Sequence, residues 1–184
     1  MFKIIYILLS FSLFADSLPN GLLKDLDKKK IDLFEVIDGN ATVINFWFLA
    51  CEPCKKEMAY LSDYNVKYSK YGFKVLSINT DNARTLNKVK PFVKSKDYSF
   101  PVLLDPKSLY FRKVGGKICP YLLVVDNDGE IINRHTGYNP GDEIKLEHEI
   151  VSLLYSEISS DTTLTDSSII KILDKVKLQK NKVD

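Results

Sequence analysis

The chain contains few of the side chains from which most binding and catalytic sites are built: 3 cysteines, 2 histidines and 1 tryptophan among 184 residues. Arginine occurs only at positions 84, 112 and 134, which disfavours dedicated clamps for phosphate or carboxylate groups. The formal net charge is +2, and the basic residues are scattered rather than gathered with aromatic side chains on one face. We therefore expect no nucleic-acid partner. Beyond the N-terminus, no apolar run reaches the roughly 20 residues that a membrane-spanning helix requires.

The first 17 residues have the composition of a secretory signal. Lys3 supplies the positive n-region, residues 4–14 form an apolar stretch interrupted only by serines, and Ala15 and Ser17 place small side chains at the −3 and −1 positions of a cleavage after Ser17. The apolar stretch is about half as long as a membrane span, so a cleaved signal is favoured over an uncleaved N-terminal anchor. We expect a periplasmic or otherwise extracytoplasmic protein, in a compartment where disulfides persist unless another system reduces them.

Residues 18–155 are enough for one domain with a sizeable core. Residues 156–184 are expected to form a polar linker and a short amphipathic segment, because Ser, Thr and Asp are abundant just after position 155. The apolar face of that segment carries Ile169, Ile172, Leu173 and Val176. A dozen residues is marginal for an isolated helix, so packing against the domain or fraying is favoured over binding to a partner.

The strongest secondary-structure pattern is a strand–helix–strand unit. The continuous apolar run 43–48 predicts a central strand that is buried on both faces. A helical pattern follows from Cys51 to about Lys70 and ends before Gly72, and residues 74–79 predict the next strand. Since a helix joins the two strands, they should be parallel. The other expected elements are a hairpin over 22–34, a helix over 85–97, a short strand over 100–105, a brief helix over 107–113, a strand over 121–126, a turn at 127–129, a strand over 130–135 and a helix over 142–155.

Two cysteines separated by two residues stand at the start of the first long helix, in the sequence C-E-P-C. Unpaired backbone N–H groups and the helix dipole favour an anion there, so Cys51 is placed to form a thiolate. A strand, a sharp exit and C-x-x-C at a helix start together indicate a thioredoxin-like redox site. Half of a structural zinc site is the alternative, but that site needs a second C-x-x-C or a histidine pair. Only Cys119, His135 and His148 remain to supply it, so the redox interpretation is favoured.

Three segments carry more specific patterns: V-I-N-F-W-F-L-A-C-E-P-C-K-K-E-M, F-P-V-L-L-D-P and I-C-P-Y-L-L-V-V-D-N-D-G-E-I-I. Together they resemble the TlpA/ResA/CcmG group of extracytoplasmic thioredoxin-like oxidoreductases, over about residues 20–155. The resemblance implies a thioredoxin-like α/β fold, with a central mixed sheet flanked by helices, an N-terminal hairpin and a helix–strand insertion. It also implies disulfide exchange with exported proteins, often reduction of apocytochrome c before haem attachment. Electrons would come from a membrane thiol carrier, and no cofactor is implied.

The resemblance gives the two cysteines different roles: Cys51 would be the exposed attacking thiolate and Cys54 the buried resolving thiol. A static disulfide is the alternative, but so short a loop restricts the unfolded chain too little to make a useful crosslink. Glu52 between the sulfurs disfavours the thiolate, whereas Lys55 and Lys56 favour it. The motif lacks the positive histidine of strongly oxidising relatives, so we expect a reductant.

The resemblance also implicates Glu57, which lies one helical turn after Cys54 and would handle protons during exchange. An exposed glutamate paired with a lysine is the alternative. Asn45 stands where thioredoxin has a buried acid, so the proton-transferring role of that acid is vacant in this chain. This vacancy strengthens the case for Glu57.

Trp47, Cys119 and Pro120 would bind the substrate, with Pro120 in cis beside the active-site sulfurs and a backbone edge left for an extended strand. Two departures from the family leave the substrate open. Ala50 stands where relatives usually have tryptophan, and Cys119 where they have threonine, valine or another apolar residue. Cys119 could be a small buried hydrophobe, a third redox thiol or a soft metal ligand. We expect its sulfur within van der Waals reach of the active-site sulfurs; a distance beyond about 8 Å from the Cys51 sulfur would make it an ordinary packing residue.

Two other functions fit the pattern less well. A Cu(I)-binding chaperone could use Cys51, Cys54 and Cys119 as soft ligands, but copper chaperones of this fold usually carry C-x-x-x-C and a distant histidine. A peroxidase would need T-x-x before its reactive cysteine, which the residues before Cys51 do not supply. His135 and His148 have no visible partner in the sequence, and we expect both to be structural or exposed.

Overall fold

The computed structural model describes residues 16–160 and residue 171. Its centre is a mixed seven-stranded sheet in the order β2-β1-β5-β4-β3-β6-β7. The strands are β1 (Leu22–Asp25), β2 (Lys30–Asp32), β3 (Ala41–Trp47), β4 (Phe73–Asn79), β5 (Val102–Leu104), β6 (Tyr121–Asp126) and β7 (Ile131–Thr136). The helices are α1 (Glu52–Tyr68), α2 (Val89–Lys96), α3 (Leu109–Lys113) and α4 (Asp142–Ser160). Short 3-10 turns are formed by Leu33–Glu35, Ser69–Tyr71 and Leu86–Lys88.

β3, α1 and β4 form the unit that carries the C-x-x-C pair. β3 pairs in parallel with β4, with Val43 opposite Val75, and antiparallel with β6 on its other side. Every residue of β3 is buried, as expected for a strand covered on both faces. The central position and the parallel pairing predicted for this unit are therefore confirmed.

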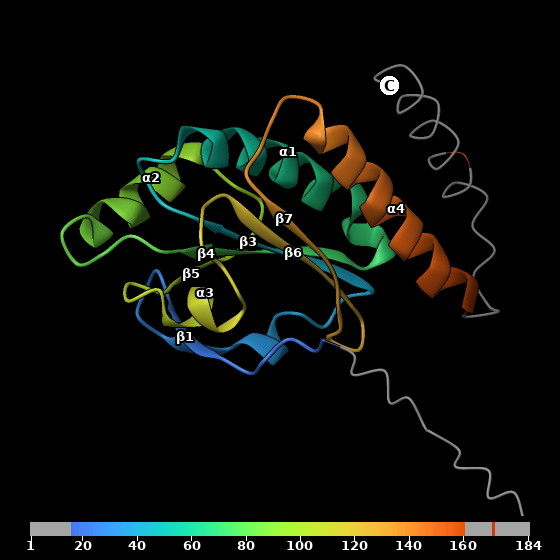
Figure 1. The fold of residues 1–184 in the computed structure, drawn as a ribbon, viewed down its shortest axis with the longest axis horizontal. Helices are drawn as coiled ribbons and strands as arrows, with labels where there is room; N and C mark the ends of the chain where they lie inside the picture. Colours follow the sequence, from blue (N-terminus) through green and yellow to red (C-terminus); the bar gives the residue numbers. More distant parts are fainter. Residues whose placement is uncertain (1–15, 161–170, 172–184) are drawn as a thin grey trace, which may run out of the picture.

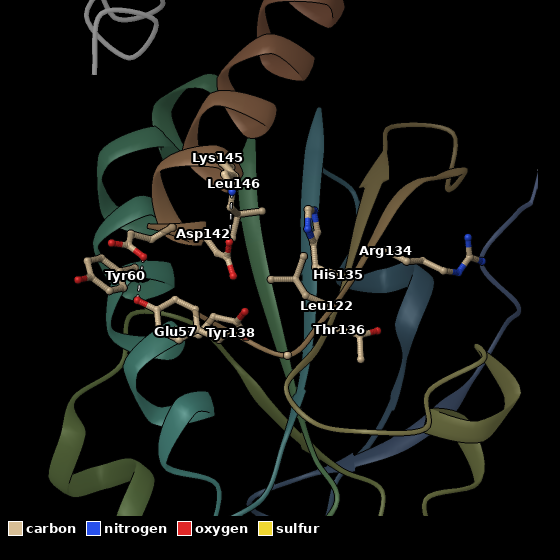
Figure 2. A pocket seen from close by; sticks show the side chains of 12 residues that line it. Glu57, Tyr60, Leu122, Arg134, His135, Thr136, Tyr138, Asp142, Lys145 and Leu146 are labelled. Atoms are coloured by element: carbon tan, nitrogen blue, oxygen red, sulfur yellow. Dashed lines mark hydrogen bonds and ion pairs between the residues drawn. The ribbon is translucent and has the colours of Figure 1, made fainter. Parts of the chain in front are cut away.

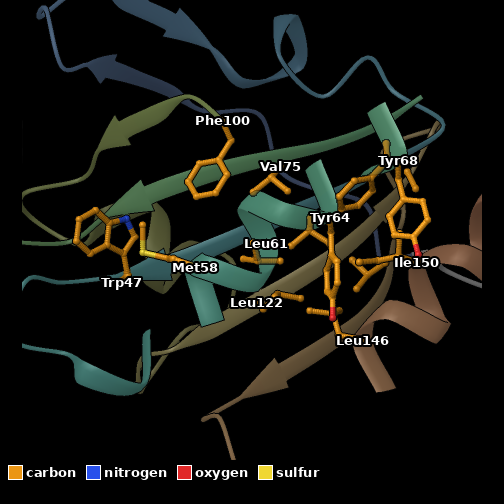
Figure 3. Close-up of a cluster of buried hydrophobic side chains, with 14 of the residues drawn as sticks. Trp47, Met58, Leu61, Tyr64, Tyr68, Val75, Phe100, Leu122, Leu146 and Ile150 are labelled. Carbon is orange, nitrogen blue, oxygen red and sulfur yellow. The ribbon is translucent and has the colours of Figure 1, made fainter. Parts of the chain in front are cut away.

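Two apolar cores lie on opposite faces of the sheet. Helices α1, α2 and α4 cover one face, and α3 lies on the other (Figure 1). Successive side chains of a strand point to opposite faces, so Val43 and Trp47 join the first core, while Ile44 and Phe46 join the second. Figure 3 shows the first core, to which the sheet, α1 and α4 contribute Trp47, Met58, Leu61, Tyr64, Tyr68, Val75, Leu122, Leu146 and Ile150.

The start and end of α1 follow from local sequence. Pro53 lies in the first turn, where the missing N–H leaves no intrahelical bond unmade. After a 3-10 turn the chain reverses at Gly72, which has a φ of 83°. A side chain there would meet the Asn40 side chain, whose nearest atom lies 2.7 Å from the added Cβ. Glycine therefore fits both the left-handed backbone and the close approach.

The N-terminal hairpin extends the sheet through β5. β1 pairs antiparallel with β2 and with β5, and β5 pairs in parallel with β4. In the hairpin turn, Asp25 Oδ1 accepts hydrogen bonds from the backbone N–H groups of Asp27 and Lys29. The predicted fold, a mixed sheet flanked by helices with an N-terminal hairpin and a helix–strand insertion, is confirmed; α2 and β5 form the insertion.

Two predicted helices differ from the observed ones at their ends. The helix expected over 85–97 is a 3-10 turn followed by α2, so Pro91 falls in the first turn of α2 and does not interrupt it. The helix expected over 142–155 runs on to Ser160. The expected end was wrong because residues 156–160 contain neither glycine nor proline, and their polar composition does not by itself end a helix.

The predicted terminal segments fall mostly outside the described residues. Residues 1–15 of the expected signal, and all but residue 171 of the amphipathic segment, lie there. Asp16 and Ser17 do contact the domain: the Asp16 carbonyl accepts from the Ile131 N–H at 2.9 Å, and Ser17 bridges to Glu130. Within residues 16–160 and 171, no helix is both long and apolar enough to cross a membrane.

Candidate active site

The C-x-x-C pair lies at the N-terminus of α1, as its sequence position predicts. Cys51 caps the helix, and its sulfur accepts a hydrogen bond from the Cys54 N–H at 3.3 Å. The two cysteines are joined by a disulfide, with their Cα atoms 5.3 Å apart. The sulfur that caps the helix is thus the one that would gain most from the dipole as a thiolate.

Both cysteines are buried, and Cys54 is slightly more buried than Cys51. Cys51 is 5% exposed and Cys54 is fully buried. Cys54 is the more buried of the two, but the expected exposure of Cys51 is not observed.

Asp81 holds the loop that leads into the motif. This buried carboxylate accepts hydrogen bonds from the Leu49 N–H at 2.7 Å, the Asn79 side chain at 2.9 Å and the Thr85 hydroxyl at 2.5 Å. The role of Asp81 was not predicted from the sequence. Its signal is an acid two positions after the end of the strand that neighbours β3, where it can reach across to the loop after β3.

Glu57 is a buried acid on the same helix as the cysteines. It is 6% exposed, and its Oε2 atom has no hydrogen-bond partner among the described residues. Burial raises the pKa of Glu57 to about 8; His135 opposes the shift and Asp142 adds to it. The carboxyl is therefore mostly protonated at neutral pH. The exposed, lysine-paired glutamate considered from the sequence is not what the structure contains.

Glu57 lines a pocket of about 270 Å³ between α1, β7 and α4. In Figure 2, Glu57 and Tyr60 project from α1, His135 lies on β7, and Asp142 projects from α4. One wall is fixed by Glu143, whose carboxylate accepts hydrogen bonds from the Tyr138 hydroxyl at 2.8 Å and the Gly141 N–H at 2.9 Å. These bonds hold the loop after β7 against the start of α4.

His135 has a partner that the sequence did not reveal. Its Nε2 atom lies 2.7 Å from the Glu149 carboxylate on α4, and the ring is half-buried. The hydrogen bond to Glu149 raises the pKa of His135, with burial opposing the shift. His135 was expected to be structural or exposed, and the structure adds a carboxylate partner that the sequence did not show. His148, half-buried on α4, does not line the pocket.

The Cys119–Pro120 peptide bond is cis, as predicted. Cys119 is a free, half-buried cysteine that packs against both cores. Burial raises the pKa of its thiol to about 11, partly offset by a hydrogen bond with the Thr80 side chain. Its proximity to the Cys51 sulfur stays a prediction.

Trp47 and Asn45 lie beneath the site on β3, and both are fully buried. The Trp47 ring packs against Phe92, with the ring centroids 5.5 Å apart. Direct contact between Trp47 and a substrate stays a prediction, one that the buried position of the indole does not favour. Above the site, Glu52 pairs with Lys55 at 2.7 Å, and this cation lowers the pKa of Glu52.

The copper interpretation gains no support from the arrangement of ligands. Between residues 16 and 160, no group of three or more His, Cys, Asp and Glu side chains is placed to hold a metal ion. Two of the three sulfurs proposed as ligands, those of Cys51 and Cys54, are joined to each other. The pair is arranged for disulfide chemistry.

Comparison with known proteins agrees with this geometry. The family model Redoxin matches residues 14–150. The chain belongs to the Redoxin family. Within it, the thiol–disulfide oxidoreductase ResA of Bacillus thuringiensis subsp. konkukian is 32% identical over 127 residues, which cover 69% of this chain and 72% of that protein. ResA of Bacillus subtilis is 29% identical over 119 residues, 65% of each chain.

Solved structures of Redoxin-like proteins share the fold. A protein of Chlorobium tepidum assigned as a thiol:disulfide interchange protein DsbE superposes with a TM-score of 0.70 and 26% identity, covering 76% of this chain and 96% of its own. The resemblance to the TlpA/ResA/CcmG group is therefore confirmed, and this Redoxin-family chain is a thiol–disulfide oxidoreductase. Its chemistry is exchange with the thiols and disulfides of substrate proteins.

Proposed function

We propose that the enzyme works in the reducing direction, with Cys51 as attacking thiolate, Cys54 as resolving thiol and Glu57 as the group that exchanges protons with Cys54. The observation that carries this proposal is a buried, protonated carboxyl one helical turn after Cys54, beside a disulfide at a helix N-terminus. A carboxyl with a pKa of about 8 can both release and accept a proton near neutral pH.

Reduction of a substrate takes two exchanges. The Cys51 thiolate attacks one sulfur of the substrate disulfide; a Cys51–substrate disulfide forms, and the other substrate sulfur leaves as a thiolate that takes up a proton. The Cys54 thiol then gives its proton to the ionised Glu57 carboxylate and attacks the Cys51 sulfur. The Cys51–Cys54 disulfide forms, and the first substrate sulfur leaves as a thiolate. Two electrons pass to the substrate.

Regeneration runs the exchange backwards with an external thiol donor. A donor thiolate attacks Cys51, and Cys54 leaves as a thiolate that takes the proton of the neutral Glu57 carboxyl. A second donor thiolate then attacks the sulfur bound to Cys51 and releases the reduced enzyme. The disulfide-bonded state described here is the one that needs a proton for Cys54, and in this state Glu57 is mostly protonated at neutral pH.

The reducing direction rests on how weakly the motif stabilises a thiolate. An oxidising enzyme owes its strength to a stabilised reduced form, yet here the residues between the sulfurs are Glu52 and Pro53. Lys55, the nearest cation in the helix, is engaged with Glu52. We infer that the Cys51 thiolate gains less from its surroundings than in a dedicated oxidase.

The similarity to ResA supports a proposal about the substrates and the location of the enzyme. We infer an extracytoplasmic enzyme that reduces exported proteins, among them apocytochrome c before haem attachment, and that takes electrons from a membrane thiol carrier. The backbone beside the Cys119–Pro120 bond would pair with an extended substrate. Two exposed apolar residues would contact the substrate's side chains: Phe48, which precedes the C-E-P-C motif, and Ile118, which precedes Cys119–Pro120.

A direct test uses an oxidised peptide with an intramolecular disulfide in a C-x-x-C-H sequence, the pattern to which c-type haem is attached. Reduced wild-type enzyme should open this disulfide, and Cys54→Ser should accumulate a Cys51–peptide adduct that dithiothreitol releases. Cys51→Ser, the matched control, should form no adduct. Absence of both peptide reduction and adduct would overturn the function. Equal rates with a C-x-x-C peptide of unrelated sequence would remove the preference for apocytochrome c and leave the exchange activity.

A further inference from the structure

His135 has no role in the exchange steps proposed above, yet it lies near the group that handles protons in them. It lies on β7 and lines the same pocket as Glu57 (Figure 2). Its Nε2 atom lies 2.7 Å from the carboxylate of Glu149 on α4. Paired in this way, the ring keeps a fixed position and a higher affinity for its own proton.

The pocket connects the buried carboxyl with solvent. Glu57 contributes an oxygen that has no partner among the described residues, whereas Thr136 and Lys145 on the lining are exposed. The pocket volume of about 270 Å³ is several times the roughly 30 Å³ that one water molecule occupies in the liquid. Water held in the pocket would lie beside the Glu57 side chain, which is 6% exposed, and could carry its proton.

The charged and titratable groups that face Glu57 come from each element around the pocket. They are Tyr60 on α1; Arg134 and His135 on β7; Tyr138 in the following loop; Asp142, Glu143 and Lys145 on α4; and Cys119 before the cis bond.

Most of these groups form an ion pair or a hydrogen bond with a residue other than Glu57. Arg134 pairs with Asp16 at 2.5 Å, and Lys145 lies 3.7 Å from Asp142. The Glu143 carboxylate is held by hydrogen bonds from Tyr138 and Gly141. The charges that act on the Glu57 carboxyl are those of His135, which favours the ionised form, and Asp142, which opposes it. His135 has this effect although it is itself paired with Glu149.

We propose that His135, held by Glu149, is a positioning residue for the exchange reaction: its charge sets the proton occupancy of Glu57, and the pocket is the path by which that proton enters and leaves. The inference rests on the proton-handling role of Glu57 proposed above. A protonated His135 stabilises the ionised carboxylate that accepts the Cys54 proton. A neutral His135 leaves Glu57 protonated, ready to supply the departing Cys54 thiolate.

The first test measures the Glu57 carboxyl in the oxidised protein, where neither Cys51 nor Cys54 titrates. Infrared difference spectra should place its pKa higher in His135→Gln than in wild type, by roughly half a unit to one unit. His135→Lys restores the charge and should reverse most of the shift. His148→Gln is the matched control, because this second histidine does not line the pocket, and it should leave the carboxyl unchanged.

A second measurement needs no change at His135. The ionised Glu57 raises the proton affinity of His135, so the NMR titration of the His135 ring should move to lower pH in Glu57→Gln. Coupled groups must affect each other in this reciprocal way. An unchanged His135 titration would overturn the proposal even if His135→Gln fails to fold.

Kinetics separate this proposal from the one on which it rests. The rate of disulfide reduction by dithiothreitol, corrected for dithiothreitol thiolate, should fall above the pKa of Glu57, and the fall should move to higher pH in His135→Gln. If His135→Gln keeps the wild-type profile while Glu57→Gln loses the fall, His135 has no positioning role and Glu57 keeps its own. If Glu57→Gln keeps the wild-type profile, the proton role of Glu57 itself is wrong.

Discussion

The carboxyl of Glu57 is buried between α1 and the sheet, and this burial raises its pKa from 4.5 to about 8. The folded protein therefore binds a proton that the unfolded chain has released throughout the range between those two values. Stability must fall as pH rises through this range, because the unfolded state binds fewer protons. The carboxyl that we propose as the proton-handling group thus weakens the fold near neutral pH.

We predict that the oxidised wild type loses roughly 3 to 5 kcal/mol of unfolding free energy, relative to Glu57→Gln, between pH 4.5 and pH 8. Denaturant unfolding of both proteins at several pH values measures this difference. The glutamine side chain has nearly the same shape as the glutamate side chain but does not titrate. The variant therefore keeps the packing and removes only the pH-dependent part of the stability. Curves that run parallel over the whole range would show that Glu57 is not buried in the protonated form.

Cys119 is another group of the site with a shifted pKa: burial raises the pKa of its thiol to about 11. The thiolate is the reactive form. We expect iodoacetamide to label oxidised protein at pH 7 roughly two orders of magnitude more slowly than it labels a free cysteine, and the rate to rise about tenfold per pH unit. Cys119→Val should abolish the labelling. Rapid labelling at pH 7 would mean that the thiolate is stabilised, as a third redox cysteine requires.

At the scale of elements, the loop between β3 and α1 depends on a neighbour across the sheet. Asp81 follows β4 and holds the Leu49 N–H two residues before the motif. We predict that Asp81→Ala destabilises the oxidised protein by about 2 to 4 kcal/mol, because one buried donor and two partly buried donors lose their acceptor. Asp63→Ala, which removes an exposed acid from α1, is the matched control and should change stability little.

The functional consequence of Asp81→Ala can be measured separately from stability. Hydrogen exchange of the Leu49 amide should become faster in the variant, while amides at the centre of β3 keep their protection relative to global unfolding. Protection of Leu49 equal to that in wild type would show that the loop holds its position without Asp81.

The sequence was sufficient to predict the elements whose patterns are local. The apolar run of β3, the cysteines at the start of α1 and the turn before β7 all depend on neighbouring residues, and each lies where it was expected. The end of α4 was missed because helix ends depend on contacts as well as composition. Polar side chains at residues 156–160 allow a helix as readily as a linker.

Parts of the site could not be predicted because they join residues far apart in the chain. The His135–Glu149 pair depends on how α4 lies against β7, and the anchoring of Leu49 by Asp81 depends on the parallel register of β3 and β4. No short-range spacing encodes either contact. Glu57 was found because its relation to Cys54 is a single helical turn, although its burial required the tertiary fold.

At the scale of the whole molecule, the sheet places the motif of α1 and the Cys119–Pro120 segment at the ends of the paired strands β3 and β6, and we propose that both serve one reaction. β3 pairs with both β4 and β6, so the segments that carry Cys51, Asp81 and Pro120 belong to three adjacent strands. The helices on one face supply the pocket with Glu57 and His135. A thiol–disulfide oxidoreductase built in this way has its direction set by the relative stability of thiolate and disulfide.

The reduction potential of the Cys51–Cys54 pair tests the central claim most directly. It is obtained by equilibrating the protein with glutathione or dithiothreitol redox buffers at pH 7 and measuring the oxidised fraction. A motif with a glutamate between its sulfurs and a buried carboxyl nearby should favour the disulfide, so we predict a potential more negative than about −180 mV. A potential near the value of about −120 mV typical of a strong oxidase would contradict the account and make the enzyme a donor of disulfides.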